Sequence, residues 1–380
     1  MLLRTFGGSF GVTAVGLFLA FLYGGTTGLA VAAILTVLEI SVSFDNAVVN
    51  ATVLGGMSEF WQKLFLTVGV LIAVFGMRLA FPLIIVGITA HLSPTAAVSL
   101  ALEKGSVHEP GSYANLLHEA HPAIAAFGGM FLLMLFLDFI LEERDITWLS
   151  WLERPLARIG KLDQLSVVVA SVLLVIAATQ LAREDKVVSV LMSGVFGMVT
   201  YILVNGLGGL LEEHEVADDD DESGSGQSAV AAPPRATGEL VLKVGKAAFV
   251  SFLYLEVLDA SFSFDGVIGA FAITSDPIII AIGLGVGAMY IRSLTVYLVR
   301  KGTLAEYVYL EHGALWAIGS LAVLLLLTIK YEIPEVVTGL IGVGFIAAAL
   351  VSSIRRNRRI GDTPSGTGTP SDLDPAPAAV

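Results

Sequence analysis

Four acidic residues lie inside apolar stretches of the sequence, in two copies of one short motif. Residues 39–46 are Glu-Ile-Ser-Val-Ser-Phe-Asp-Asn, and residues 259–266 are Asp-Ala-Ser-Phe-Ser-Phe-Asp-Gly. The aspartates Asp45 and Asp265 are 220 residues apart. A charged residue at the centre of a membrane-spanning helix costs about 2.5–3.5 kcal/mol on insertion scales, so repeated acids there indicate a function. We expect the two copies to be the halves of one cation-binding site.

The candidate ligands in both copies are oxygen atoms. The predicted metal ligands are Glu39, Asp45, Asn46, Asp259 and Asp265, and the predicted supporting residues are Ser43, Asn50, Ser263, Arg78 and Arg292. Carboxylate and carbonyl oxygens suit hard divalent cations such as Mn²⁺, Mg²⁺ and Ca²⁺. The chain has no cysteine and the motifs have no histidine, which disfavours Cu(I) and Zn²⁺ sites. The two arginines follow the motifs at similar distances, so we expect them to neutralise part of the acidic charge.

The motif spacing also predicts a local break in the helices. On a regular helix, the aspartate of each copy would lie about 120° away from the face that holds the first acid and the second serine. Unwinding near 43–46 or 263–266 would turn both carboxylates to one side and free backbone carbonyls. Because Gly266 and Gly269 favour such a break, we expect it at least in the second copy.

The composition places these motifs in a polytopic membrane protein. Hydrophobic residues make up 55% of the 380 and charged residues only 14%, and many apolar runs are long enough to cross a bilayer. We predict an all-α transmembrane helical bundle of about ten spans: 7–23, 28–54, 63–91, 122–141, 165–182, 187–211, 243–273, 277–300, 313–330 and 334–353. The absence of a basic aromatic patch argues against nucleic-acid binding.

The repeat extends beyond the motif and predicts the domain organisation. We expect a first membrane repeat over 1–211, an acidic flexible cytoplasmic linker over 212–239, a second membrane repeat over 240–354 and a disordered tail over 355–380. By homology between the copies the boundary falls near 186, because span six begins the second five-helix unit. An odd number of crossings separates equivalent helices, so the repeats should be inverted, as in secondary transporters.

The basic residues predict the orientation in the membrane. With the N-terminus inside, 15 lysines and arginines fall in inner segments and 4 in outer segments. By the positive-inside rule, both termini should be cytoplasmic, in a multi-pass protein of the cell membrane.

The two motifs, together with the segment from Tyr309 to Gly313, resemble the TerC integral membrane family, whose members are associated with tellurium resistance. The linker and the number of spans suggest a larger branch of it, and Gly266 stands where that family usually has serine. The resemblance implies metal export with manganese as substrate, and metal ligation by the five predicted ligands.

We therefore expect a transporter, not an enzyme, that exports Mn²⁺ or a similar cation through the doubled acidic site. The expected partners are the lipid bilayer and the transported ion. No permanently bound cofactor is expected, and carboxylates that release metal can accept protons, so proton exchange is a plausible drive. Two alternatives remain: an intramembrane aspartyl protease that uses Asp45 and Asp265, and a stress-response membrane scaffold that needs none of the acids.

Overall fold

The computed structural model of the chain describes residues 2–69, 71–144, 146–162, 164–219, 245–301 and 307–361. The elements in this part of the chain are all helices, which confirms the all-α class. They are α1 (Leu2–Val42), α2 (Phe44–Gly55), α3 (Glu59–Leu64), η1 (Phe65–Gly69), η2 (Ile72–Ala80), α4 (Phe81–Thr89), α5 (Pro94–Leu102), α6 (Tyr113–Leu141), α7 (Ser150–Ile159), α8 (Leu165–Gln180), η3 (Glu184–Lys186), α9 (Val187–Asp219), α10 (Gly245–Ile273), α11 (Pro277–Lys301), α13 (Leu310–Thr328) and α14 (Glu335–Gly361).

The helices are long and apolar enough for a multi-pass membrane protein. Seven stretches of the described residues could cross a bilayer by length and composition: Phe6–Ser41, Glu59–Ile88, Tyr113–Leu141, Glu184–Leu207, Pro277–Val299, Leu310–Thr328 and Val336–Arg359. The ten ranges expected from the sequence are helical over most of their length. Three features make the seven stretches fewer than the ten expected spans. Helix α8 is only 16 residues long, α10 is not among the seven, and α1, although broken, is counted as one stretch.

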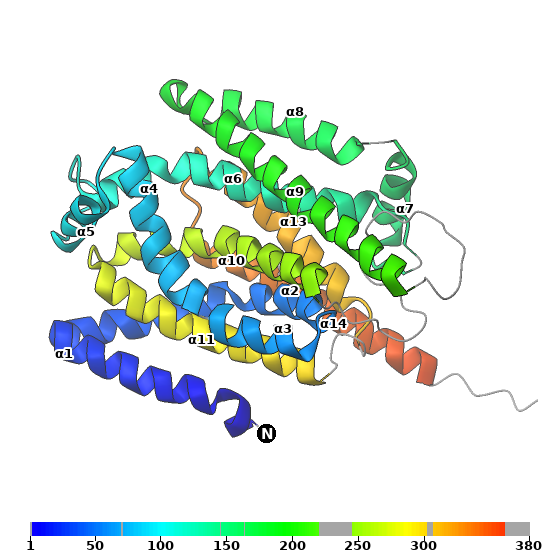
Figure 1. The fold of residues 1–380 in the computed structure, drawn as a ribbon, viewed down its shortest axis with the longest axis horizontal. Coiled ribbons are helices and arrows are strands. Elements are labelled where there is room, and N and C mark those ends of the chain that lie inside the picture. The colour runs from blue at the N-terminus through cyan, green and yellow to red at the C-terminus, as the bar shows by residue number, and fades with distance from the viewer. Residues whose placement is uncertain are drawn as a thin grey trace, which may run out of the picture.

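Most of the long helices lie side by side along the longest axis of the molecule (Figure 1). The centre of the bundle is α6, which packs between α9 and α13 and buries Phe131, Leu132 and Met134. In contrast, α1 and α9 expose large apolar side chains such as Phe18 and Phe196. This distribution, with apolar side chains both inside and on the outer surface, is what a lipid surrounding requires.

Contacts between distant segments define the two ends of the bundle. At the first, the Lys104 end, Lys104 lies 2.7 Å from Asp276 and over the ring of Tyr23. The Asp276 carboxylate and then the Tyr23 hydroxyl raise the pKa of Lys104 well above its usual value. At the opposite, Arg144 end, Arg144 Nη1 lies 3.8 Å from Glu311 Oε1. The chain segments that connect the helices are therefore gathered in two groups.

The helix carrying the first motif copy is interrupted, whereas the helix carrying the second is not. Gly25, at φ +63°, divides α1 into two helical segments, and Ser43, at φ −94° and ψ 16°, separates α1 from α2. By contrast, α10 is continuous from Gly245 to Ile273. The expected break is therefore present in the first copy, and the prediction of a break in the second copy is wrong.

Other segments contain more helix than the sequence indicated. The segment 92–121, between the third and fourth predicted spans, contains α5 and the first turns of α6, and α7 follows α6. Helix α9 continues to Asp219, into the range expected to be a linker. Residues 220–239 of that linker and 362–380 of the tail lie outside the described residues.

Candidate functional site

The acid of the first motif copy forms a buried ion pair with an arginine. Glu39, near the end of α1, is 3% exposed and accepts a hydrogen bond at Oε1 from Nη2 of Arg78, which comes from the π-helix η2 and is 4% exposed. Ser43, at the break between α1 and α2, also donates to Oε1 of Glu39, at 3.1 Å. The break therefore places a second donor beside the carboxylate.

The second motif copy holds its acid in the same way. Asp259 of α10 lies 3.3 Å from Nη2 of Arg292, which comes from α11, and both residues are buried. Arg292 also donates to the carbonyls of Phe65 and Gly69 and lies 3.8 Å from the centre of the Phe65 ring. Each pair thus joins a motif helix to the next span, as the sequence repeat predicted for the two arginines.

The two pairs lie at different depths in the bundle. Gly287 of α11 packs directly on Glu39, since a Cβ atom there would lie 2.5 Å from both Cβ and Cγ of Glu39. Arg292 follows Gly287 by five residues, which is about 7.5 Å along a helix. Because α11 starts beside Asp276, the Glu39 pair is nearer the Lys104 end and the Asp259 pair nearer the Arg144 end.

The two motif copies meet inside the bundle. A Cβ atom placed on Gly266 of α10 would lie 3.4 Å from Oε2 of Glu39. The acid of the first copy therefore lies beside the backbone of the second copy, one residue after Asp265. The glycine that distinguishes this sequence from the expected serine leaves the Glu39 carboxylate room to approach α10.

The remaining predicted ligands have different outcomes. Asp45 and Asp265 lie in α2 and α10, but their side chains are outside the described residues. Asn46 and Ser263 are buried, at 4% exposure each. Asn50 is fully buried, and its side-chain amide nitrogen and oxygen have no hydrogen-bond partner in the described part of the chain. Such an amide costs about 1–3 kcal/mol, which marks a polar site within α2.

Glu256 is an acidic residue of the site region that the sequence analysis missed. It lies one turn before Asp259 on α10, is 6% exposed, and neither carboxyl oxygen has a hydrogen-bond partner among the described residues. A Cβ atom on Gly69 would lie 2.7 Å from Oε1 of Glu256 and 3.0 Å from Nη1 of Arg292. Thr36 stands at the matching position of the first copy, so a comparison of the repeats does not reveal Glu256.

Within the described residues, no three histidine, aspartate or glutamate side chains come close enough to hold a metal ion together. The side chains of Asp45 and Asp265 are not among the described ones. The described acids of the two motif helices instead form two neutral pairs, Glu39 with Arg78 and Asp259 with Arg292, and Glu256 has no hydrogen-bond partner among the described residues.

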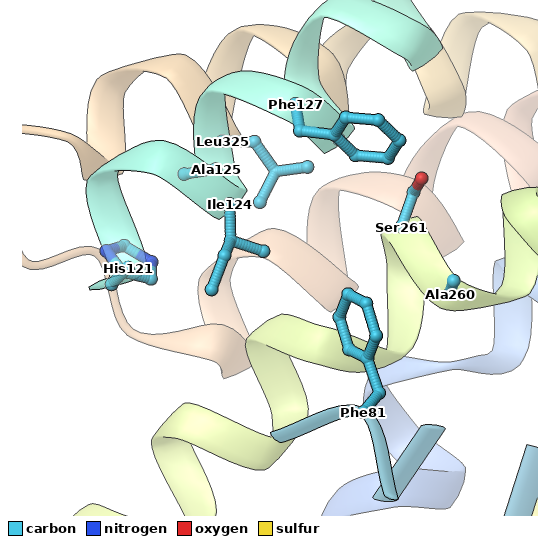
Figure 2. Close-up of a pocket in the computed structure, with 9 residues that line it drawn as sticks. Phe81, His121, Ile124, Ala125, Phe127, Ala260, Ser261 and Leu325 are labelled. Carbon is cyan, nitrogen blue, oxygen red and sulfur yellow. The ribbon is translucent and has the colours of Figure 1, made fainter. Parts of the chain in front are cut away.

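Two cavities adjoin the site helices. One is apolar and lies between α4, α6, α10 and α13, with Ser261 of the second motif at its edge (Figure 2). Ser261 donates its hydroxyl proton to the carbonyl of Val257 in its own helix. The other, of about 120 Å³, is lined by Arg78, Tyr113, Phe271 and residues of α5. It therefore extends from the Glu39–Arg78 pair to helix α5.

Comparisons with known proteins assign the family but no activity. Searches of the curated proteins and of the solved structures gave no match to the chain. One family model matches residues 44–360, which is most of the chain and includes nearly all of the elements described above. The chain therefore belongs to the DUF475 family, whose description is a protein of unknown function.

Proposed function

We propose that the chain is a transporter that exports a hard divalent cation, with Mn²⁺ as the first candidate, through a site shared by the two motif copies. The observation that carries this proposal is the approach of Glu39 Oε2 to within 3.4 Å of the Cβ position of Gly266. Glu39 and Asp259, 220 residues apart in sequence, are both buried in the protein interior rather than facing lipid, and Glu39 lies beside the backbone of the second copy. The resemblance of the motifs to the TerC family supports the same substrate class.

Helix packing supports an inverted repeat around this site. Helix α2 packs on α11 and α13, and its counterpart α10 packs on η2 and α6, which are the counterparts of those partners. Equivalent helices thus have equivalent neighbours, and the two ion pairs lie at two depths, as a two-fold axis in the membrane plane would place them. We propose that the chain crosses the membrane ten times. Each helix is then five crossings away from its counterpart, and the odd number makes the two repeats run in opposite directions.

The arginines suggest how the transporter holds its acids when no ion is bound. A buried carboxylate without a counter-charge is strongly unfavourable, so Arg78 and Arg292 keep Glu39 and Asp259 neutralised in the ion-free state. A divalent cation would compete with each guanidinium for its carboxylate. Glu256, whose oxygens are unpartnered beside Arg292, is then the alternative partner to which Arg292 moves when Asp259 binds the ion.

The charge distribution supports the direction of export. Exposed arginines lie at the Arg144 end, on α7 and at the end of α14, as the positive-inside rule requires of a cytoplasmic side. An exported cation would then reach the Asp259 pair first and the Glu39 pair second. The 120 Å³ cavity beside Arg78 lies between the Glu39–Arg78 pair and α5. In this proposal, α5 closes the exit for the ion in this conformation.

Purified protein in liposomes tests this proposal. With Mn²⁺ enclosed and a fluorescent indicator outside, the wild-type chain should release the ion, and Asp45→Asn and Asp265→Asn should each reduce the rate at least tenfold. Glu59→Gln, at an exposed acid of α3, is the matched control and should leave the rate unchanged. Equal efflux from both variants and the wild type would refute the site, and cleavage of a helical peptide by the wild type alone would favour the protease.

A further inference from the structure

Helix α7 presents an exposed basic and apolar face at the Arg144 end. It lies across the direction of α6, α8 and α9 (Figure 1). Trp151 is 76% exposed, and Ile159 and Leu162 are 53% and 63% exposed. Arg154 and Arg158 are exposed between them.

The opposite face fixes α7 to the bundle. Glu153 is 6% exposed and its carboxylate accepts hydrogen bonds from the backbone nitrogens of Trp148 and Leu149 and from the indole nitrogen of Trp316 in α13. Ala157, one turn later, is also buried. Helix α7 is therefore held in one orientation, and its exposed side chains face away from the protein.

The order of side chains around α7 matches that of an interfacial helix. At 100° per residue, Arg154, Arg158 and Trp151 lie within about 60° of each other, and Ile159 lies about 80° beyond Trp151. A basic edge beside an aromatic and apolar edge is typical of helices that lie at the boundary between headgroups and acyl chains.

The apolar edge is continuous with the lipid-facing surface of the bundle. Leu162 precedes α8, on which Val168, Val172 and Val175 are exposed. The partner that meets both edges of α7 is therefore the membrane that surrounds α8, and the arginines require that its headgroups be anionic. The C-terminal end of α14 lies at the same end of the bundle (Figure 1) and carries exposed arginines, among them Arg355 and Arg358.

We propose that α7 is an anionic-lipid binding site: Arg154 and Arg158 bind the phosphates of acidic phospholipids, and Trp151, Ile159 and Leu162 enter the acyl boundary. Each basic residue held at an anionic surface strengthens its attraction about fivefold. The inference does not depend on the proposed transport, because it uses no residue of the ion-pair site.

The lack of cysteine makes the depth of α7 directly measurable. Leu162→Cys carries the only thiol of the chain, and a nitroxide attached to it reports accessibility to oxygen and to a water-soluble nickel complex. Val172→Cys on α8 provides a lipid reference, and Glu109→Cys, in an exposed loop, provides a water reference. Because Leu162 is mostly exposed, the substitution should not disturb folding, and Ile159→Cys is a second reporter on the same edge.

In vesicles of phosphatidylcholine with one third phosphatidylglycerol, the Leu162 label should resemble the lipid reference. The variant carrying Arg154→Gln and Arg158→Gln should retain at least fivefold less phosphatidylglycerol by native mass spectrometry, whereas Lys63→Gln, at another exposed basic residue, should retain the wild-type amount. A label as accessible to nickel as the water reference would overturn the proposal. Protection that appears only in native membranes would overturn it in favour of a protein partner.

Discussion

The two partners of the Arg292–Asp259 pair should contribute very unequally to stability. At 3.3 Å and an effective dielectric constant of about 20, the Coulomb attraction between the two charges is about 5 kcal/mol. Burial of each ion costs several kcal/mol, so the net contribution of the pair is small. What matters for a single substitution is therefore the charge that it leaves without a partner.

Asp259→Asn leaves Arg292 with several neighbours. Its guanidinium keeps the carbonyls of Phe65 and Gly69 and the face of the Phe65 ring, and the Glu256 carboxyl is within reach. We expect a loss of about 1–3 kcal/mol, the usual range for a buried hydrogen-bonded group. Arg292→Gln instead leaves Asp259 and Glu256 buried together without a cation, and we expect a loss of about 3–5 kcal/mol.

The free energy of unfolding can be measured by titrating SDS into mixed micelles and following helicity by circular dichroism. Glu256→Gln should recover part of the loss in the Arg292→Gln background, because it removes one of the two uncompensated acids. Glu59→Gln should change stability by less than about 0.5 kcal/mol, as expected of a surface position. If Asp259→Asn costs as much as Arg292→Gln, or if Glu256→Gln gives no recovery, the account of this site is wrong.

Two further predictions concern positions that hold the site and α7 in place. Gly287→Ala should lower stability by about 1–3 kcal/mol and reduce efflux, because the new methyl group would overlap Glu39. Gly344→Ala is the control and should be neutral or stabilising, because nothing lies within 4 Å of its added Cβ. Thermal unfolding of both variants in nanodiscs measures the difference. Glu153→Ala leaves three donors without an acceptor and should make α7 accessible to limited proteolysis, while Trp316→Phe removes one donor and should leave α7 protected.

The sequence was sufficient to predict that Arg78 and Arg292 neutralise acids of the two motifs. That prediction rests on residue type and spacing. Few charges are tolerated in a membrane interior, and in both copies of the motif an arginine follows the acid at a similar distance. The break at Ser43 and the continuity of α10 at Ser263 could not be predicted in the same way. Both copies contain Ser-x-Ser-Phe-Asp, and the glycine that favours a break lies in the continuous copy, so local preference does not predict which helix is interrupted.

Glu256 was missed for the opposite reason. The repeat draws attention only to positions that match, and Glu256 is matched by Thr36, which donates to the carbonyls of Ala32 and Gly283. The two copies therefore differ in chemistry at positions that match in the sequence. Such a difference can be recognised only when the unpartnered oxygens of the glutamate are seen in the folded chain.

The charge balance of the two motif helices favours a positive cargo. The two motif helices carry five acids, Glu39, Asp45, Glu256, Asp259 and Asp265, and the neighbouring spans carry two buried arginines, which leaves an excess of three potential negative charges. Two of the acids are neutralised by the arginines, and each of the others must hold a proton or a cation when it is in the membrane interior. An anion would add to the excess, whereas a divalent cation removes two charges at once. We therefore propose that a site of this composition selects hard cations and couples their binding to the protonation of the acids that remain.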